Sequence, residues 1–219
     1  MIHDPRPSPR LAHIREAVER HRDEFVLVHA VSEAANESTS LSAVLNEVTQ
    51  MVCEFMRWPI GHAFTVTHER LPTTQPLDIW YLEDPAIHGA FRAATETMDD
   101  ADGLGPLCFG LVPHSLHDIA DCPNFRRREA ARQLGLNHYH AIPILSESEV
   151  VGGIEFLAAR PAPQARARLD SLLVNISVAL GRVAERELRD RQRHLLIRTE
   201  LARWTASSRA AELQRLASE

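Results

Sequence analysis

The stretch Phe125–Phe156, FRRREAARQLGLNHYHAIPILSESEVVGGIEF, decides the fold. Its arginine-rich beginning predicts a short helix that ends at Gly135, because glycine readily adopts the positive φ found just after helices. Two strands are predicted next, His138–Leu145 and a second that closes in Gly-Gly-Ile-Glu-Phe, joined by a polar turn of Ser and Glu. A hairpin that leads into a long helix favours a sensory or regulatory module over a self-contained enzyme.

The long helix is predicted from Ala165 to the last residue, with leucines and isoleucines at helical spacing among many Arg and Glu. If it is continuous, its roughly 55 residues extend about 80 Å, well beyond one domain. A helix of this length buries its apolar stripe only against a partner, so a parallel dimer is expected. The heptad pattern is imperfect, because three charged residues fall near its seam: Glu187, Arg191 and Arg198.

The rest of the chain supplies the other elements of one domain. Residues 1–10 are rich in proline and predicted to be disordered, residues 11–163 to form the domain, and residues 164–219 to form the C-terminal helix and linker. Further helices are predicted at Leu11–Ala34, from near Ser40 to Trp58, and at Pro85–Thr97. Further strands are predicted at Gly61–Thr67, Asp78–Leu82 and Ser115–Ile119. Residues 70–76 are predicted to be a loop, and Asn124 to cap the helix that ends at Gly135.

The composition excludes several classes of function. All 24 basic residues are Arg, since the sequence contains no Lys, which excludes Schiff-base lysines, a Walker lysine and the strand lysine of protein kinases. A net charge of −6 argues against a broad nucleic-acid surface. No apolar run approaches the roughly 18 residues of a membrane span, and the N-terminus lacks the apolar core of a secretory signal. A cytoplasmic protein that neither spans a membrane nor binds nucleic acid is therefore expected.

Four segments resemble the GAF domains of bacterial sensor histidine kinases and diguanylate cyclases. They are similar to the first helix–strand junction, the second strand with its following helix, the stretch before the last hairpin, and the hairpin itself. In this chain they read WPIGH at 58–62, IWYL at 79–82 with FRAATE at 91–96, DIADCPNF at 118–125, and AIPI at 141–144 with EVVGGIEF at 149–156. The chain departs from the family pattern at residues 103–106, GLGP, in a loop that lies over the pocket of GAF domains.

The resemblance covers about Phe25 to Glu187 and implies an α+β fold. The expected architecture is a GAF-like antiparallel sheet of five to six strands with helices on one face, extended by the long C-terminal helix. The implied function is that of a non-enzymatic sensory module, which forms a homodimer through Leu11–Ala34 and the helix from Ala165 onward. A small-molecule ligand would shift the exit helices, and a histidine kinase or diguanylate cyclase would follow as the output domain. The sequence identifies no cofactor.

Seven aromatic, His and Asp side chains are candidates for the ligand pocket: Trp80, Phe109, His114, His117, Asp118, His138 and His140. His138 and His140 lie two apart on a predicted strand, so both are expected on one face of the sheet. These histidines also suggest a metal or haem site as a hypothesis. Their spacing matches no closed zinc motif, however, and histidines in surface loops are the simpler interpretation, so no metal ligand is assigned.

Two other functions stay open. One is a dimerisation scaffold that binds nothing, because its pocket is filled by Trp80, Phe109 and Tyr139. The other is a methionine sulfoxide reductase, which requires Cys108 and Cys122 close enough to bridge, with Cα atoms within about 7 Å. Three widely spaced cysteines argue against a disulfide framework. The run Arg126–Arg128 could attract a phosphate, but a solvated helix face is the simpler interpretation.

Overall fold

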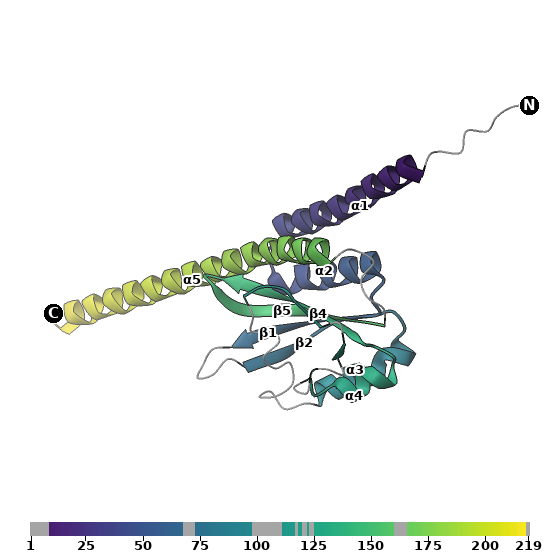
Figure 1. Ribbon diagram of the computed structural model, residues 1–219. Helices are drawn as coiled ribbons and strands as arrows, with labels where there is room; N and C mark the ends of the chain where they lie inside the picture. Colours follow the sequence, from purple (N-terminus) through teal and green to yellow (C-terminus); the bar gives the residue numbers. More distant parts are fainter. Residues whose placement is uncertain are drawn as a thin grey trace, which may run out of the picture.

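The chain folds around a five-stranded antiparallel sheet (Figure 1). The computed structural model describes residues 9–67, 73–97, 111–116, 118–119, 122, 125–159 and 166–217, and it describes side chains from residue 23 on, apart from 166–167, 210–214 and 217. The elements in chain order are α1 (Pro9–Glu37), α2 (Leu41–Met56), β1 (Ile60–Thr67), β2 (Thr73–Leu82), α3 (Pro85–Glu96), β3 (His114–Leu116), α4 (Arg128–Gln133), β4 (His138–Ser146), β5 (Glu149–Ala158) and α5 (Arg166–Ala217). The strand order is β2-β1-β5-β4-β3.

Helices cover both faces of this sheet. The larger core lies between the sheet and the three long helices, and includes Val31 of α1, Val48 of α2 and Leu173 of α5. A second core lies on the opposite face, where Phe91 of α3 and Ala131 of α4 pack against the strands. The predicted α+β class, antiparallel sheet and long C-terminal helix are confirmed. The expectation that all helices share one face is not met, because the short helices α3 and α4 lie on the other face.

Local sequence explains where several elements begin and turn. Asp84 precedes α3 and its carboxylate accepts hydrogen bonds from the N–H groups of Ala86 and Ile87, while Pro85 occupies the first helical position. The hairpin between β4 and β5 turns through Glu147 and Ser148, both with positive φ, as a two-residue turn requires. The predicted polar turn is therefore confirmed. Gly135 has φ 68°, which agrees with its predicted role after α4.

Glycine in β5 allows the sheet to close tightly over β1. A Cβ atom on Gly153 would lie 2.4 Å from the ring of Phe64 and 2.8 Å from the carbonyl oxygen of Ile142. Only a residue without a side chain fits there.

Two predicted boundaries are corrected by the structure. The loop predicted over residues 70–76 extends too far, because β2 already begins at Thr73. Pro76 is tolerated in this strand since β2 lies at the edge of the sheet. The helix that ends near Gly135 begins only at Arg128, with Arg127 in the position before it. The predicted cap, Asn124, lies outside the described residues.

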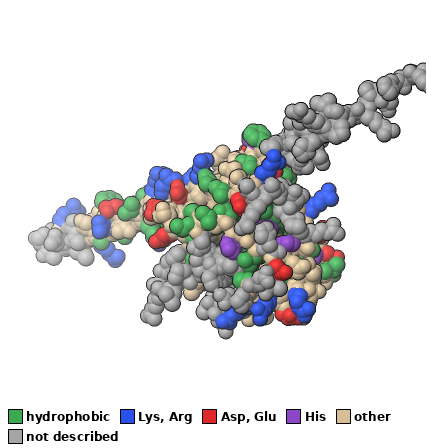
Figure 2. Space-filling model, viewed as in Figure 1, with side chains coloured by type: hydrophobic (Ala, Val, Ile, Leu, Met, Phe, Trp, Pro, Cys, Tyr) green, Lys and Arg blue, Asp and Glu red, His purple; other side chains and the backbone are tan. Residues whose placement is uncertain are grey.

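The helix α5 has 52 residues, and only its first part packs on the domain. Its side chains are exposed from Leu188 onward as far as they are described, and this part extends about 45 Å. Figure 2 shows hydrophobic, basic and acidic side chains mixed along it. The helix α1 projects from the opposite side of the domain (Figure 1). None of the described helices is both long enough and apolar enough to cross a membrane.

Candidate functional site

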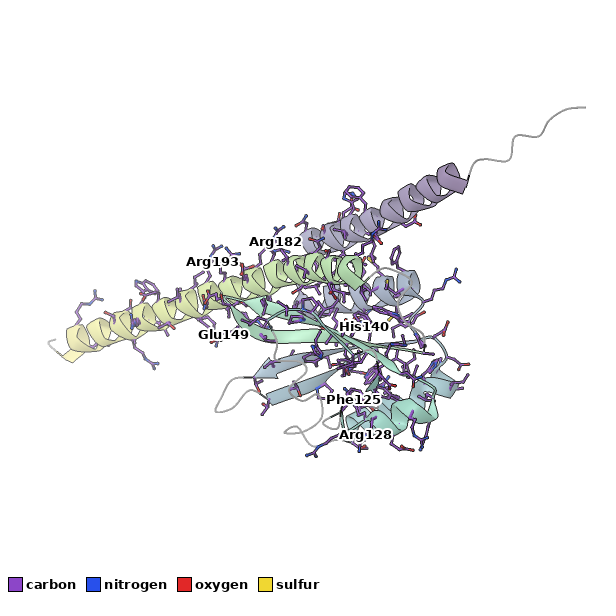
Figure 3. All side chains as sticks on the ribbon, viewed as in Figure 1. Phe125, Arg128, His140, Glu149, Arg182 and Arg193 are labelled. Atoms are coloured by element: carbon purple, nitrogen blue, oxygen red, sulfur yellow. The ribbon has the colours of Figure 1, made fainter. Side chains whose placement is uncertain are left out.

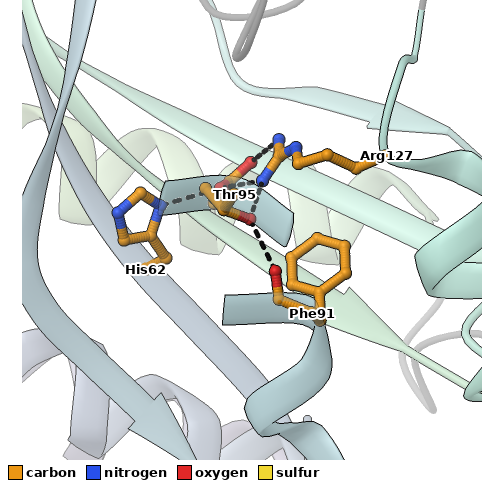
Figure 4. A network of polar contacts seen from close by, with 5 residues as sticks. His62, Phe91, Thr95 and Arg127 are labelled. Atoms are coloured by element: carbon orange, nitrogen blue, oxygen red, sulfur yellow. Dashed lines mark hydrogen bonds and ion pairs between the residues drawn. The ribbon is translucent and has the colours of Figure 1, made fainter. Parts of the chain in front are cut away.

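A buried carboxylate lies at the centre of the face that α3 and α4 cover. Glu155 of β5 is completely buried and forms two hydrogen bonds of 2.6 Å with the guanidinium group of Arg127. The Nδ1 atom of His62, on the neighbouring strand β1, lies 2.8 Å from the same carboxylate. Arg127 also donates to the hydroxyl of Thr95 at 3.3 Å, and that hydroxyl donates to the carbonyl of Phe91 (Figure 4). The network therefore joins β1, β5, α3 and the start of α4.

The two ionic charges compensate each other. Burial alone would raise the pKa of the Glu155 carboxyl, but the charge and hydrogen bonds of Arg127, together with the hydrogen bond from His62, lower this pKa from 4.5 to about 2. Glu155 is thus ionised at neutral pH and can only accept hydrogen bonds. It follows that His62 donates through Nδ1–H, and in the tautomer that carries its proton there, Nε2 is an acceptor.

Aromatic rings enclose this network. The indole of Trp80 stacks on His62, with ring centroids 3.9 Å apart and planes inclined by 19°. The guanidinium of Arg127 lies 5.1 Å from the ring centre of Phe91 and 5.0 Å from that of Phe125, within cation–π range. Figure 3 shows Phe125 beside Arg128 on the α4 side of the sheet. The rings keep water away from the ion pair, which strengthens its electrostatic attraction.

The register of the sheet places one residue from each strand in a single row across this face. Trp80 pairs with His62 and His62 with Glu155, and Glu155 pairs in turn with Ala141 and Ala141 with His114. Residues that pair directly across antiparallel strands point to the same face. Ala141 and its neighbours belong to the core beneath α3 and α4, so the whole row faces that side.

Three side chains in this row carry a buried nitrogen that has no hydrogen-bond partner among the described residues. They are Nε2 of His62, Nε1 of Trp80 and Nε2 of His114. The indole N–H of Trp80 can only donate, and Nε2 of His62 can accept when the imidazole proton is on Nδ1. The row then presents one hydrogen-bond donor and one acceptor to a ligand. A buried polar atom without a partner costs free energy. A ligand with complementary groups would recover that free energy, which makes the row a candidate binding site.

The sequence-predicted pocket residues divide between the two faces. Trp80 and His114 lie in the row just described. His140 lies on the other face, where it stacks on Trp58 at 4.5 Å and forms a hydrogen bond of 2.8 Å with Ser115. His138 precedes it by two residues and shares that face, as expected from strand alternation. Asp118 is exposed beyond the end of β3, and Phe109 and His117 lie outside the described residues.

The described residues give little support for a cysteine-based reductase or for a metal site. Cys53 is buried against the helices, and burial together with Glu54 raises the pKa of its thiol. Cys122 is half-buried and Cys108 lies outside the described residues, so the distance needed for a reductase is not described. Within the described part of the chain, no three His, Cys, Asp or Glu side chains gather in a way that would hold a metal ion.

The residues at the centre of the site were missed from the sequence. Arg127 was interpreted as part of a solvated helix face, which is wrong, because its side chain is buried against Glu155. A signal was present in Glu155 itself, since it interrupts an otherwise apolar strand. A charge in such a place must be paired, which would have prompted a search for a basic partner.

The long helix is fixed to the domain by two consecutive residues at the point where it leaves. Arg186 donates to the carbonyl groups of Ala35 and Ser38 at the C-terminal end of α1. Glu187 accepts a hydrogen bond of 2.8 Å from the N–H of Leu41, the first residue of α2. A cation at the C-terminal end of one helix and an anion at the N-terminus of the next both complement the helix dipoles. The exit of α5 is thereby tied to the turn between α1 and α2.

No family model and no curated protein matches the sequence. Solved structures do resemble the chain. The GAF domain of a predicted sensor histidine kinase from Pseudomonas syringae pv. tomato has a TM-score of 0.53 at 13% identity, covering 85% of this chain and 99% of its own. The phycoerythrobilin-bound GAF domain of a cyanobacterial phytochrome has a TM-score of 0.54 at 12% identity, covering 77% and 97%.

A third similar structure is an enzyme. Free methionine-R-sulfoxide reductase from Neisseria meningitidis, solved with its substrate, has a TM-score of 0.50 at 12% identity, covering 76% of this chain and 91% of its own. At such identities the likeness shows the fold, and fold does not specify function. The chain has the fold of GAF domains, as its sequence predicted. Two of the similar structures named as GAF domains come from a sensor histidine kinase and a cyanobacterial phytochrome.

Proposed function

We propose that this chain is a sensory module that binds a small molecule against the Trp80–His62–Glu155–Ala141–His114 row. The observation that carries the proposal is the set of three buried nitrogens without described partners, beside the buried ion pair of Arg127 and Glu155. The ion pair keeps the row electrically balanced, so the unpaired indole and imidazole nitrogens select the ligand through neutral hydrogen bonds. The expected ligand is therefore uncharged where it meets His62 and Trp80.

The signal would leave through α5. Glu155 lies on β5, the last strand before this helix, and the Arg186–Glu187 pair ties the helix to α1 and α2. A ligand that favours one position of the strands would shift the exit of α5, and with it an output domain such as a histidine kinase or diguanylate cyclase. The sensor kinase and the phytochrome among the similar structures support a role in signal transduction, and we propose that the chain acts in the cytoplasm without a catalytic role of its own.

The exposed part of α5 supports a homodimer, together with α1. Ile197, Leu201 and Trp204 are exposed and follow the alternating spacing of four and three residues that coiled coils use. Leu196, also exposed, falls outside this seam. We expect Leu201→Arg to convert the dimer to a monomer in size-exclusion chromatography with light scattering, whereas Leu196→Arg leaves the mass unchanged. A wild-type chain that is monomeric at micromolar concentration would contradict this part of the proposal.

The ligand is tested by native mass spectrometry and an absorption spectrum of the chain purified from its own host. Extra mass that is lost on denaturation, or an absorption band in the visible, is expected. Trp80→Phe keeps an aromatic ring but removes the indole N–H, so it should lower the fraction of the protein that carries the ligand. Trp204→Phe makes the same change on the exposed part of α5 and should not. A clean protein mass in wild type, without any bound species, would contradict ligand binding.

That contrary result would favour the scaffold, which one observation supports. Tyr139 is completely buried in the core beneath α4, and Trp80 already stacks on His62, so two of the three rings expected to fill the pocket occupy this face. The third, Phe109, lies outside the described residues. The two proposals separate in the variant Trp80→Ala. A scaffold would lose stability and gain an empty cavity, whereas a receptor would lose its ligand as well.

A further inference from the structure

A groove lies apart from the row of Trp80 and His62, where α5 leaves the domain. This groove has a volume of about 420 Å³, in the range of small-molecule sites. It is bounded by the first turns of α2, by strands β1, β2, β4 and β5, and by the stretch of α5 where that helix leaves the domain. Its apolar walls are formed by Leu41, Leu45, Val66, Leu77, Val151 and Leu188.

The inner end of the groove presents an unsatisfied hydroxyl. Ser146 lines the groove, is buried, and its Oγ has no hydrogen-bond partner among the described residues. Strand β4 runs alongside α5, since Ser177 Oγ donates to the carbonyl of Pro143 at 2.6 Å and a Cβ on Gly181 would lie 2.7 Å from the carbonyl oxygen of Leu145. Ser146, one residue further, therefore lies beside Ala184, which also lines the groove.

The outer end presents a cation. Both oxygens of Glu187 are engaged, because one accepts from Leu41 N–H and the other from Arg191 at 2.5 Å. Arg191 is largely exposed, and this one bond leaves further N–H donors of its guanidinium group for a ligand. It lies seven residues beyond Ala184, which corresponds to about 10 Å along the helix axis. The stretch 182–198 also carries six Arg against three acidic residues, so an anion is favoured here.

The geometry points to a second ligand site for a bipolar aliphatic molecule, separate from the proposed sensory pocket. Its carboxylate meets Arg191, a hydroxyl or carbonyl oxygen at its other end meets Ser146, and the chain between them lies on the apolar walls. Such a molecule bridges β4 and α5 next to the Glu187–Leu41 contact. Binding would therefore fix the direction in which α5 leaves the domain, independently of any ligand on the α4 face.

Three eight-carbon molecules that differ only in their end groups test the two ends of the groove separately. Isothermal titration calorimetry with the full chain should give saturable one-to-one binding of ω-hydroxyoctanoate. Octanoate lacks the hydroxyl and should bind about fivefold more weakly, the effect of one hydrogen bond. Octanediol lacks the carboxylate and should bind about tenfold more weakly, since a charge-assisted bond is the stronger of the two.

Three variants locate the site, two of them with matched controls. Ser146→Ala should abolish the preference for ω-hydroxyoctanoate over octanoate without changing the fold. Arg191→Gln should weaken both acids about tenfold and leave octanediol unchanged. Arg193→Gln is its control, because Arg193 projects from α5 on the side away from the sheet (Figure 3). Ser42→Phe places a ring in the groove and should block binding, whereas Ala43→Phe, exposed on the same turn, should not.

Several results would overturn the inference. Wild type that shows no saturable binding of ω-hydroxyoctanoate contradicts it outright. Binding that survives Ser42→Phe would place the acid elsewhere, for example on the exposed stripe of α5. If Ser42→Phe instead changed the oligomeric state, the groove would be an interface between two copies of the chain. None of these results bears on the α4-face pocket, whose test uses Trp80.

Discussion

The carboxylate of Glu187 on α5 accepts a hydrogen bond from the backbone N–H of Leu41, across 146 positions of sequence. Ser40 occupies the N-cap position of α2, but its side chain makes no capping hydrogen bond. The long helix α5 therefore supplies the cap for α2 in its place. Any movement of α5 relative to the domain must break this contact or carry α2 with it.

We expect Glu187→Ala to destabilise the chain by about 1 kcal/mol, the usual cost of losing an N-cap. Amide hydrogen exchange should become faster at the first residues of α2, because their N–H groups lose an acceptor. Glu185→Ala, on the same turn of α5, is the control and should leave exchange in α2 unchanged. Equal exchange in both variants would show that the Glu187 contact does not hold α2.

Removing the charge of Glu155 should destabilise the fold severely. Glu155→Gln leaves the buried guanidinium of Arg127 without its counter-ion, and breaking such a pair costs about 3–5 kcal/mol. Urea unfolding measures this loss. Glu149→Gln, on the exposed start of the same strand, should change stability by less than about 0.5 kcal/mol. The double variant Arg127→Met, Glu155→Leu should regain much of the loss, because no charge remains buried.

The same pair predicts a loss of stability in acid. The pKa of Glu155 is about 2 in the folded chain against 4.5 for the ordinary group. Its contribution is therefore fully present above pH 4.5 and is lost as the pH falls toward 2. The difference corresponds to roughly 3 kcal/mol at neutral pH. Unfolding free energies should fall more steeply over this window in wild type than in the Arg127→Met, Glu155→Leu variant, and parallel curves would contradict the assignment.

The tautomer of His62 provides a direct spectroscopic check of the site. Since the ionised Glu155 can only accept, the ¹⁵N spectrum should show His62 protonated at Nδ1 at neutral pH. Exposed His29 should instead show the averaged signals of a solvated ring. A proton on Nε2 alone would mean that the carboxylate does not receive this hydrogen bond. In that case the acceptor proposed to face the ligand would be absent.

Two glycines should respond to alanine in opposite directions. Gly89 lies inside α3, and a Cβ atom added to it would meet no other atom within 4 Å, so Gly89→Ala should stabilise the chain by about 0.5–1 kcal/mol. Gly153→Ala would press a methyl group against Phe64 and the carbonyl of Ile142 and should destabilise it by about 1–3 kcal/mol. Thermal unfolding of both variants measures the contrast. A neutral Gly153→Ala would argue against the close packing of β1 and β5.

Much of the fold could be predicted from local sequence. The hairpin Glu147–Ser148, the Asp84-Pro85 start of α3 and the positive φ of Gly135 each follow from what a few adjacent residues favour. The extent of β2 could not be predicted in this way. Pro76 indicates the end of a strand unless that strand is known to lie at the edge of the sheet. Edge positions are set by pairing between distant segments, which local patterns do not contain.

The site was predicted less well for a related reason. Three consecutive arginines, 126–128, look alike in sequence, and only tertiary contacts decide that Arg127 is buried while its neighbours are exposed. Glu155 lies 28 positions from Arg127 and 93 from His62, so no short motif joins them. Trp80 and His114, both named from the sequence as pocket candidates, lie in this row, and their contact with a ligand stays a prediction. Their alignment in one row depends on the register of four strand pairs.

The opposite projection of α1 and α5 has a mechanical consequence. Because α1 and α5 project from opposite sides, a pull or twist applied to one helix would reach the other only through the domain. The load would pass through the packed helices α1, α2 and α5, which share one core. The ion pair of Arg127 and Glu155 lies on the other face of the sheet and would bear little of this load.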